Sequence, residues 1–519
     1  MFLFFFLLLC IGLNIFRDYG VHWDEYNNQH FGDRLVNFIS PVVPAKTLFA
    51  GHTKYYVKHD FIHGPIVEIL LTSLTKVLRL KDSRDIIFIR HLSIFLLFYI
   101  GMVFFYLLCL RYFKSWRLAL LGAVFLALSP RIFAEAFYNT VDIAFMVFFV
   151  ISIFTLLLVL DKRSFLSIAA HSLVCAFLIN IRLIGLTLPI FTIFFFCLEF
   201  LYADSRLDKI AAVKSIVIYV FLLALFTVIL NPFLWPHPLD NFIFLINSAN
   251  NFTAHRYDFY LGQYRLLSQQ PWHYAPVWMA VTTPLIYTAL FCIGCFDEIK
   301  SFFKNPPLPY SVKRNTTILF LWFFLPLMMS KGRIYDGWRH IYFIYPAFLI
   351  LALTGTRYIW GGIVKLSFKK IGKIMRGAVI ILLMFSFLDT TFFMIRNHPY
   401  QNLYFNVLVG KNSDDASKNF TLDYWGLSNR KALEYILKND RSAHIPIFAA
   451  QWAGKVNAKI LPYADRGRIV FAPINKSKYF LTTDMQNPCP HYLNEEYCGK
   501  EYYSIKVDGM KIIVVYKLK

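Results

Sequence analysis

Long apolar runs separated by short charged segments fill the first three quarters of the chain. The first run extends from Met1 to Phe16, and the later runs approach the roughly 20 residues that a helix needs to cross a bilayer. Together they predict about eleven membrane-spanning helices. After the first run, the expected spans cover residues 92–110, 118–136, 143–160, 165–181, 183–201, 215–235, 275–296, 316–330, 341–360 and 377–395.

Two of these spans meet near Arg182, where the pattern has an alternative. The two short helices expected on either side of Arg182 can equally be one long helix that breaks at Gly185 or Pro189. An arginine between two apolar runs is costly in a membrane unless it faces a partner. Arg182 is therefore a candidate contact for an anionic group, and snorkelling to the membrane surface is the alternative.

A polar segment, residues 17–91, follows the first run and is expected to form an external loop. Within it, residues 65–80 alternate leucines with Glu68, Lys76 and Arg79. This amphipathic pattern predicts a helix that lies along the membrane surface.

From residue 397 to the end the chain has the composition of a soluble domain. The pattern predicts a helix over 429–437, short strands over 445–449, 468–471 and 479–482, and a terminal hairpin that turns at Asp508-Gly509. The expected fold class is therefore an all-α polytopic membrane domain, residues 1–396, followed by a small extracytoplasmic α/β domain, residues 397–519. The order of the strands is left open.

Composition supports a membrane protein and excludes a nucleic-acid-binding one. The 519 residues are 57% hydrophobic and only 16% charged, far more apolar than a soluble domain. The net charge of +22 comes from small basic clusters between the apolar runs, which is how orientation determinants are distributed. A nucleic-acid-binding face would instead gather these residues into one patch.

The basic clusters also predict the orientation. Lysine and arginine are in excess in the segments 111–117, 161–163, 204–214, 297–314 and 361–376, which are expected to be cytoplasmic. The N-terminus is then cytoplasmic in a multi-pass protein of the cell membrane, and the C-terminal domain lies outside. Cys489 and Cys498, in a polar stretch of that domain, are candidates for a disulfide.

The segment His22-Trp23-Asp24-Glu25 contains the strongest candidate chemistry. Its two carboxylates follow the first span and have no basic neighbour at helical spacing. Asp24 is the candidate general base, because a carboxylate within hydrogen-bond reach of a reacting hydroxyl can take its proton. Capping of a turn is the alternative for Asp24. Glu25 is a weaker candidate that would position the acceptor, hold a metal, or be solvated.

Other polar residues are expected on the same side of the membrane. Asp142 opens a span, where it can either position the acceptor or a metal, or be stabilised by the helix dipole. Arg333, Arg339 and His340 share one short external loop against the expected charge bias, which indicates anion binding. Arginine suits phosphate because its planar fork holds two oxygens at once.

Several of these strings occur together in one known family. The chain resembles the bacterial branch of the family 39, protein O-mannosyltransferase-like membrane glycosyltransferases. The strings that carry the resemblance include His22-Trp23-Asp24-Glu25, Asn180-Ile181-Arg182, Asn231-Pro232-Phe233 and Tyr335-Asp336-Gly337-Trp338-Arg339. The resemblance implies a C-type glycosyltransferase fold and a polyprenyl-phosphate sugar donor used on the extracytoplasmic face. It also implies that Asp24 is the base.

The sequence thus predicts an integral-membrane glycosyltransferase that moves a hexosyl or pentosyl group to a protein, lipid or glycan acceptor. A transporter or flippase of lipid-linked sugars is the alternative, and it would need polar residues near the middle of the membrane rather than at one face. Two hard oxygen ligands on separate loops would suit Mg²⁺ or Mn²⁺. The sequence leaves open whether a metal is used, and which sugar and acceptor are involved.

Overall fold

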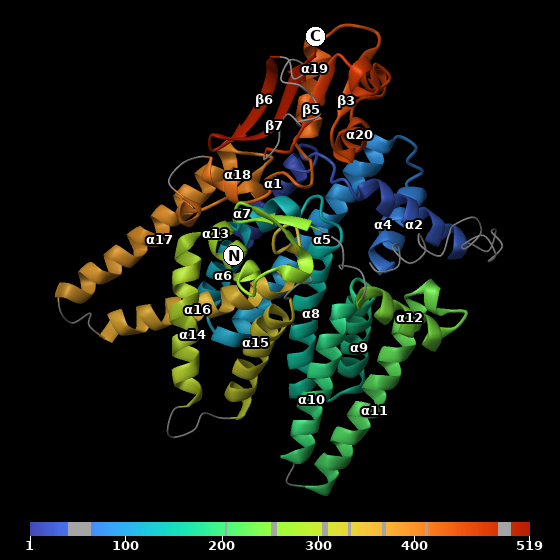
Figure 1. Ribbon diagram of the computed structural model, residues 1–519. Coiled ribbons are helices and arrows are strands. Elements are labelled where there is room, and N and C mark those ends of the chain that lie inside the picture. The colour runs from blue at the N-terminus through green and yellow to red at the C-terminus, as the bar shows by residue number, and fades with distance from the viewer. Residues whose placement is uncertain are drawn as a thin grey trace.

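The computed structural model describes residues 1–39, 64–202, 205–250, 257–303, 310–330, 334–365, 370–410, 414–485 and 500–518. It is a bundle of helices with a mixed α/β domain at one end (Figure 1). In the described part of the chain, six helical segments are long and apolar enough to cross a membrane, which supports a multi-pass membrane protein. They are Ser83–Phe113, Asp142–Asp161, Leu183–Leu201, Arg206–Ile229, Arg339–Ile363 and Lys373–Arg396.

The bundle helices follow the expected order along the chain. They are α1 (Phe2–Ile15), α5 (Ser83–Phe113), α6 (Trp116–Ala127), α7 (Pro130–Glu135), α8 (Asp142–Asp161), α9 (Phe165–Ile179), η2 (Leu183–Leu186), α10 (Thr187–Leu201), α11 (Arg206–Ile229), α13 (Tyr274–Thr282), α14 (Leu285–Phe302), α15 (Tyr310–Met329), η5 (Arg339–Ile344), α16 (Tyr345–Lys365) and α17 (Lys370–Arg396).

Two expected spans are each broken in two. The span expected over 118–136 consists of two helices, α6 and α7. Pro130 is the first residue of α7, a position where the backbone N–H that proline lacks would have no partner within the helix. The span expected over 275–296 becomes α13 and α14, with Pro284 directly before α14. The count of eleven spans is therefore not confirmed. Near Arg182, two helices with a break between them are found rather than one long helix.

The external segment is shorter than the expected 17–91, because α5 begins at Ser83. Asp82 caps this helix, since its Oδ1 accepts a hydrogen bond from the backbone N–H of Arg84 at 2.8 Å. Arg90 falls within the external loop expected over 17–91, but it lies inside α5. This shift places Arg90 at the end of the bundle that carries the C-terminal domain.

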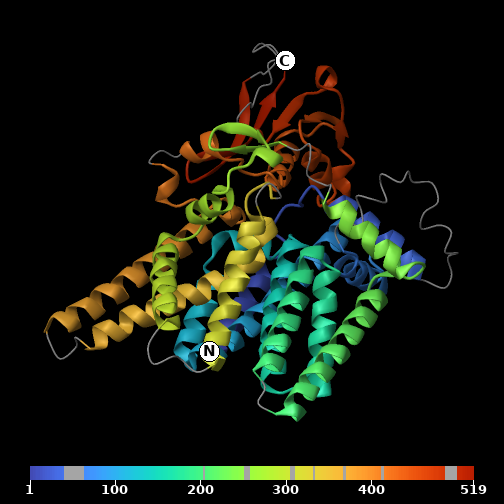
Figure 2. The same cartoon turned by 60° about the horizontal axis from the view of Figure 1, so that its bottom comes forward.

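Two helices of the external segment pair with each other. They are α2 (Glu25–Ile39) and α4 (Ile66–Val77), and α4 confirms the amphipathic helix expected over 65–80. The short α12 (Pro238–Asn250) lies beside α2 (Figure 2), where Phe31 and Leu35 share an apolar cluster with Phe233, Leu234 and Leu245. These helices close one side of the candidate site.

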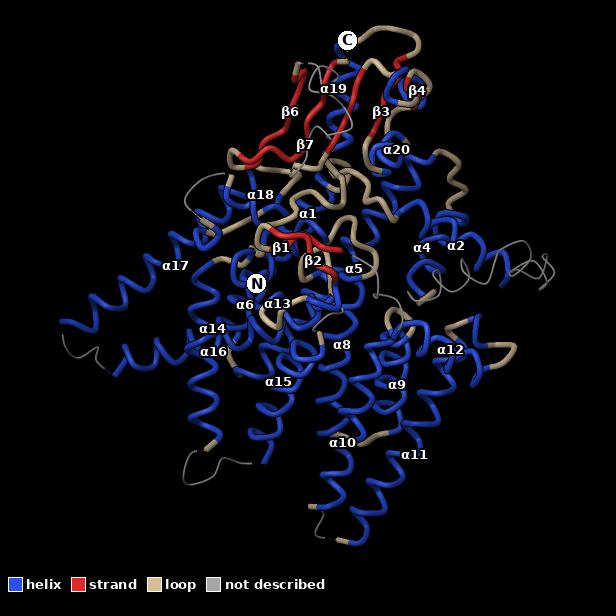
Figure 3. The backbone as a smooth tube through the Cα atoms, in the orientation of Figure 1, coloured by secondary structure: helices blue, strands red, loops and turns tan. Residues whose placement is uncertain are grey.

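The C-terminal domain is built on a five-stranded mixed sheet of order β4-β3-β5-β7-β6 (Figure 3). The strands β4, β3 and β5 are parallel, and β5, β7 and β6 are antiparallel. The strand and hairpin predictions are confirmed, and the hairpin turns at Asp508 and Gly509 with φ of 45° and 86°. The strands are β3 (Ile445–Ala449), β4 (Ile469–Phe471), β5 (Tyr479–Thr482), β6 (Glu501–Val507) and β7 (Met510–Lys517).

Three helices and a separate hairpin complete this end of the molecule. The helix α19 (Asn429–Asn439) contacts β6 and β7, α20 (Trp452–Ala458) contacts β3 and α19, and α18 (Asp415–Asn419) contacts β7. The hairpin of β1 (Tyr257–Tyr260) and β2 (Gln263–Leu266) belongs to the loop before α13. Short helical turns, including η3 (Pro232–Leu234), η4 (Leu267–Gln269), η6 (Gln401–Leu403), η7 (Val407–Val409), α21 (Tyr463–Arg466) and η8 (Ile474–Lys476), connect these elements.

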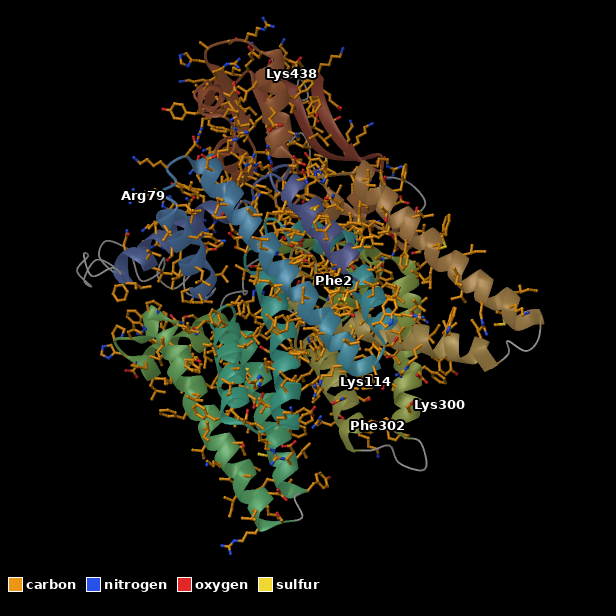
Figure 4. All side chains as sticks on the ribbon, turned by 180° about the vertical axis from the view of Figure 1, so that it is seen from behind. Phe2, Arg79, Lys114, Lys300, Phe302 and Lys438 are labelled. Atoms are coloured by element: carbon orange, nitrogen blue, oxygen red, sulfur yellow. The ribbon has the colours of Figure 1, made fainter. Side chains whose placement is uncertain are left out.

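Two of the basic segments expected in the cytoplasm, those with Lys114 and Lys300, begin away from the C-terminal domain. Figure 4 shows Lys114 and Lys300 toward the far end of the bundle, whereas Lys438 lies in the C-terminal domain. This separation agrees with a position of the basic segments and of the C-terminal domain on opposite sides of the membrane. Which of these sides is cytoplasmic stays a prediction. Cys489 and Cys498 lie outside the described residues.

Candidate active site

A cavity of about 200 Å³ lies where the bundle meets the C-terminal domain. Its walls come from five parts of the chain: the start of α2, helix α4, the turn before α8, the break between α9 and η2, and the loop before η5, with one residue from the C-terminal domain. The lining side chains include His22, Asp24, Asn27, Asn28, Phe31, Val67, Glu68, Asn139, Thr140, Val141, Asp142, Ile181, Arg182, Tyr335, Arg339 and Trp425. Four of the seven residues that the sequence singled out therefore line one cavity.

Asp142 lies between two arginines at the floor of the cavity. Its Oδ1 pairs with Nη2 of Arg182, and its Oδ2 lies 3.2 Å from Nη1 of Arg339. Asn139 holds the same carboxylate, because Nδ2 of Asn139 donates to Oδ2 of Asp142 at 2.9 Å. Asp142 is thus the first residue of α8 and also the common partner of two cations that lie far apart in the sequence.

Both arginines retain hydrogen-bond donors for a further anion. Nε of Arg182 and Nε of Arg339 are buried, and neither has a hydrogen-bond acceptor among the described residues. Buried polar groups are normally paired, and an unpaired one calls for an explanation. Two guanidinium groups with unused donors suit an oxyanion such as a phosphate.

Arg339 also lies against aromatic rings. Its Cζ lies 4.8 Å from the ring centroid of Trp425, 5.2 Å from that of Tyr335 and 5.6 Å from that of Tyr424. Guanidinium groups stack on aromatic faces, which restricts their orientation. Two of these rings belong to the C-terminal domain, so that domain helps to fix the position of Arg339.

Asp24 is the partly buried carboxylate of the cavity wall. Its side chain makes no hydrogen bond or ion pair within the described ranges, and its backbone oxygen accepts from the N–H of Asn28 at 2.9 Å. A carboxylate that faces a cavity and is not engaged by a cation remains able to take a proton. The position of Asp24 is therefore compatible with the expected role of a base.

Glu25 faces a different environment from its neighbour Asp24. It is 2% exposed, pairs with Nε of Arg90, and its Oε2 lies 2.7 Å from Nε2 of His22. Burial alone would raise the pKa of Glu25, but the positive charge of Arg90 and the bond to His22 hold this pKa well below its usual range. Glu25 is not among the described residues that line the cavity, and its contacts are those of a structural ion pair.

Glu68 lines the cavity and pairs with the buried Arg90, and sequence reasoning assigned neither residue to the site. Oε2 of Glu68 lies 2.7 Å from Nη2 of Arg90, and Oε1 accepts a hydrogen bond from the hydroxyl of Thr140 at 3.3 Å. Burial raises the pKa of Glu68 against the opposing charge of Arg90. One signal was present in the sequence: Glu68 shares its helical face with Leu71 and Thr75, so it faces inward and not toward water.

A second buried layer supports the turn before α8. Glu135 is fully buried, where its Oε1 accepts a hydrogen bond from the hydroxyl of Tyr342 at 2.7 Å and its Oε2 accepts one from Asn139 at 2.6 Å. Asn139 therefore links two carboxylates, Glu135 and Asp142, and fixes the orientation of both.

The remaining two candidates are His340 and Arg333. His340 is partly exposed, its ring centroid lies 4.5 Å from that of Tyr335, and it is not among the described lining residues. Arg333 lies outside the described residues. Among the described residues, the arginines that line the cavity are Arg182 and Arg339.

The acidic residues present do not form a good cation site. Asp142 already pairs with two arginines and Glu25 with a third, so their charges are compensated. The described part of the chain contains no cluster of three or more histidine, cysteine or acidic side chains placed to hold a metal ion.

Comparisons with known proteins support the fold. No protein-family model matches the chain, and no curated protein does. The crystal structure of the apo oligosaccharyltransferase from Archaeoglobus fulgidus matches with a TM-score of 0.53 and 12% identity, over 98% of this chain and 74% of the other. ArnT from Cupriavidus metallidurans bound to undecaprenyl phosphate matches with a TM-score of 0.42 and 12% identity over 88% of each chain. The chain shares the fold of the Archaeoglobus oligosaccharyltransferase, which fits the C-type glycosyltransferase fold expected from its sequence, although family 39 itself is not confirmed.

Proposed function

We propose that the protein is an integral-membrane glycosyltransferase that takes a sugar from a polyprenyl-phosphate-linked donor. The observation that carries this proposal is a single cavity lined by one unengaged carboxylate, Asp24, and two arginines with unused donors, Arg182 and Arg339. Sugar transfer from a phosphate needs both a base for the acceptor and positive charge for the leaving group. The shared fold with an oligosaccharyltransferase agrees with this chemistry.

In the proposed reaction, the acceptor hydroxyl attacks the anomeric carbon of the donor sugar. The bond between that carbon and the phosphate oxygen breaks, and the electron pair leaves with the lipid phosphate. Asp24 takes the proton of the hydroxyl, and the charge that develops on the phosphate is stabilised by Arg182 and Arg339. Asp142 positions the two arginines, with which it forms ion pairs. The sequence position of Asp142 predicts that it positions the acceptor or a metal, and the proposed mechanism gives it this other role.

The site should face the extracytoplasmic side, because Lys114 and Lys300 of the expected cytoplasmic segments lie toward the opposite end of the bundle. The donor would come from the membrane and the acceptor, a protein, lipid or glycan, from the aqueous side. A base and an anion site at one face of the membrane favour this reading over the transporter or flippase, which needs a path through the bilayer.

The test is sugar transfer in proteoliposomes with radiolabelled polyprenyl-phosphate sugars and an extract of acceptors. Replacing Asp24 by Asn preserves its shape but removes the base, and general-base catalysis typically contributes about 10²–10⁴-fold to the rate. The variant Asp24→Asn should therefore transfer sugar at least about 100-fold more slowly than the wild type. The matched control is Asp33→Asn, since Asp33 lies on α2, the helix that directly follows Asp24, is outside the cavity lining, and pairs with Lys76 at 3.7 Å.

If the Asp24→Asn protein transfers sugar as fast as the Asp33→Asn control, Asp24 is not the base. If the wild type transfers no sugar from any of the labelled donors while it remains folded, the proposed activity is wrong.

A further inference from the structure

Asn457 of the C-terminal domain holds the loop that leads to Asp24. Its Oδ1 accepts a hydrogen bond from the backbone N–H of Val21 at 2.9 Å, and its Nδ2 donates to the backbone oxygen of Val21 at 2.8 Å. Nδ2 also lies 3.1 Å from the oxygen of Gly426. Asn457 is fully buried, although it is 436 positions away from Val21 in the sequence.

Tyr19 and Gly20, which precede Val21 in the same loop, also contact the C-terminal domain. Nη1 of Arg430 donates to the backbone oxygen of Tyr19 at 2.8 Å. At Gly20, an added Cβ would lie 2.2 Å from the backbone oxygen of Leu427, a distance that no side chain tolerates. The backbones of the loop and the C-terminal domain therefore approach each other as closely as a glycine allows.

The C-terminal domain reaches the cavity through Trp425. This ring lies 4.8 Å from the guanidinium carbon of Arg339 and 5.0 Å from the ring of His22, the residue that follows Val21. Asn457 and Trp425 are linked through Gly426, which the amide of Asn457 contacts. The C-terminal domain thus contacts the loop before Asp24 through Asn457, and it contacts Arg339 through Trp425.

We infer that Asn457 is a positioning residue, which fixes the backbone before Asp24 and so places the carboxylate opposite the donor held by Arg182 and Arg339. This inference rests on the proposed function. The C-terminal domain is then part of the catalytic unit and not an appended binding module. Displacement of a reacting group by about 1 Å can lower a rate about 100-fold, so the loss of this contact should reduce kcat. The KM for the donor should change little, because neither arginine contacts Asn457 through a hydrogen bond.

The test compares Asn457→Asp and Asn457→Ala with the control Asn439→Asp. The aspartate keeps the size of the side chain and still accepts from the N–H of Val21, but it turns a carboxylate oxygen toward the carbonyls of Val21 and Gly426. Asn439 is exposed in the same domain, where its amide donates only to the oxygen of Tyr435 at 2.8 Å. Both Asn457 variants should lower kcat about 10–100-fold with an unchanged donor KM, and the control should match the wild type.

Hydrogen–deuterium exchange of the full protein gives a readout that does not depend on activity. In both Asn457 variants, the peptide that covers residues 17–24 should exchange faster, while peptides from β3 and β5 keep the wild-type rate. Unchanged exchange of this peptide, or unchanged kcat, would overturn the positioning role. Faster exchange throughout the C-terminal domain would also overturn it, because Asn457 would then only support folding. If the wild type proves inactive, the proposed function fails separately, and the exchange still decides whether Asn457 holds the loop.

Discussion

Oδ2 of Asp142 lies 3.2 Å from Nη1 of Arg339, although 197 positions of sequence separate the two residues. The same carboxylate pairs with Arg182 through its other oxygen. One buried negative charge therefore holds two positive ones together. Without it, the two guanidinium groups would repel each other in a buried site.

Replacing Asp142 by Asn should lower kcat/KM about 10–100-fold, because the arginines lose the charge that fixes their positions. The amide keeps the shape of the carboxylate but removes its charge and replaces one of its two acceptor oxygens by a donor. Steady-state kinetics with a labelled donor in proteoliposomes measures the effect. The control is Asp208→Asn, in the exposed first turn of α11. Equal kinetics for the two variants would exclude this role of Asp142.

Arg182→Ala should weaken binding of a polyprenyl phosphate about 10–100-fold, since a hydrogen bond to a charged group contributes about 1.5–3 kcal/mol. Arg182→Lys should restore only part of the affinity, because an ammonium group cannot form the two parallel bonds of a guanidinium. Equilibrium binding of the radiolabelled lipid phosphate to the solubilised protein measures both. Arg117→Ala, at an exposed position beside Trp116, serves as the control. Full recovery in the lysine variant would show that only charge matters at this position.

Arg90→Met should destabilise the protein by about 3–5 kcal/mol, because it leaves Glu25 and Glu68 buried without their shared cation. Thermal unfolding in detergent should show a lower midpoint than that of Arg206→Met, an exposed position at the start of α11. Adding Glu25→Gln and Glu68→Gln should recover part of the loss, since no charge then stays unpaired. A single variant as stable as the control would contradict the importance of this network.

Stability should depend on pH through Asp258 of the β1–β2 hairpin. Burial, and then the charge of Asp336, raise the pKa of Asp258 to about 7, while the hydroxyl of Tyr274 donates to its carboxylate. In the unfolded chain this pKa is about 3.9, so the folded protein binds the proton more tightly. The contribution to stability is therefore complete below about pH 4 and is lost as the pH rises toward and through about 7.

Asp258→Asn should remove this loss, because the amide does not ionise. Between pH 5 and pH 8, the unfolding midpoint of the variant should rise relative to that of the wild type. Asp465→Asn, a partly exposed carboxylate in α21, is the control and should follow the wild type. A constant difference between Asp258→Asn and the wild type over this range would show that Asp258 does not titrate there.

The sequence by itself determined the elements whose signals are local. The strands over 445–449 and 479–482 have the predicted bounds, and the hairpin turns at the predicted Asp508-Gly509, because alternation and turn residues act over a few positions. Apolar runs likewise indicated most bundle helices. They did not show where prolines such as Pro130 and Pro284 divide a run, since an apolar composition continues across the break.

Only the tertiary structure decided which polar residues meet. Asp24 and Glu25 are adjacent, but successive residues at a helix start point about 100° apart, so one lines the cavity and the other pairs with Arg90. Asp142 and Arg182 were candidates by sequence, and their pairing became visible only when the chain was folded.

The sequence left open whether aromatic residues of the C-terminal domain such as Trp425 cover the site or fill a core, and the structure places Trp425 in the cavity lining. A buried asparagine such as Asn457, and a tryptophan such as Trp425, have the same local pattern whether they fill a core or complete a distant site. Their contacts with Val21 and Arg339 join segments hundreds of residues apart. Such contacts follow from packing of the whole chain, because the free energy that selects them comes from burial and hydrogen bonding in the folded state and not from local preference.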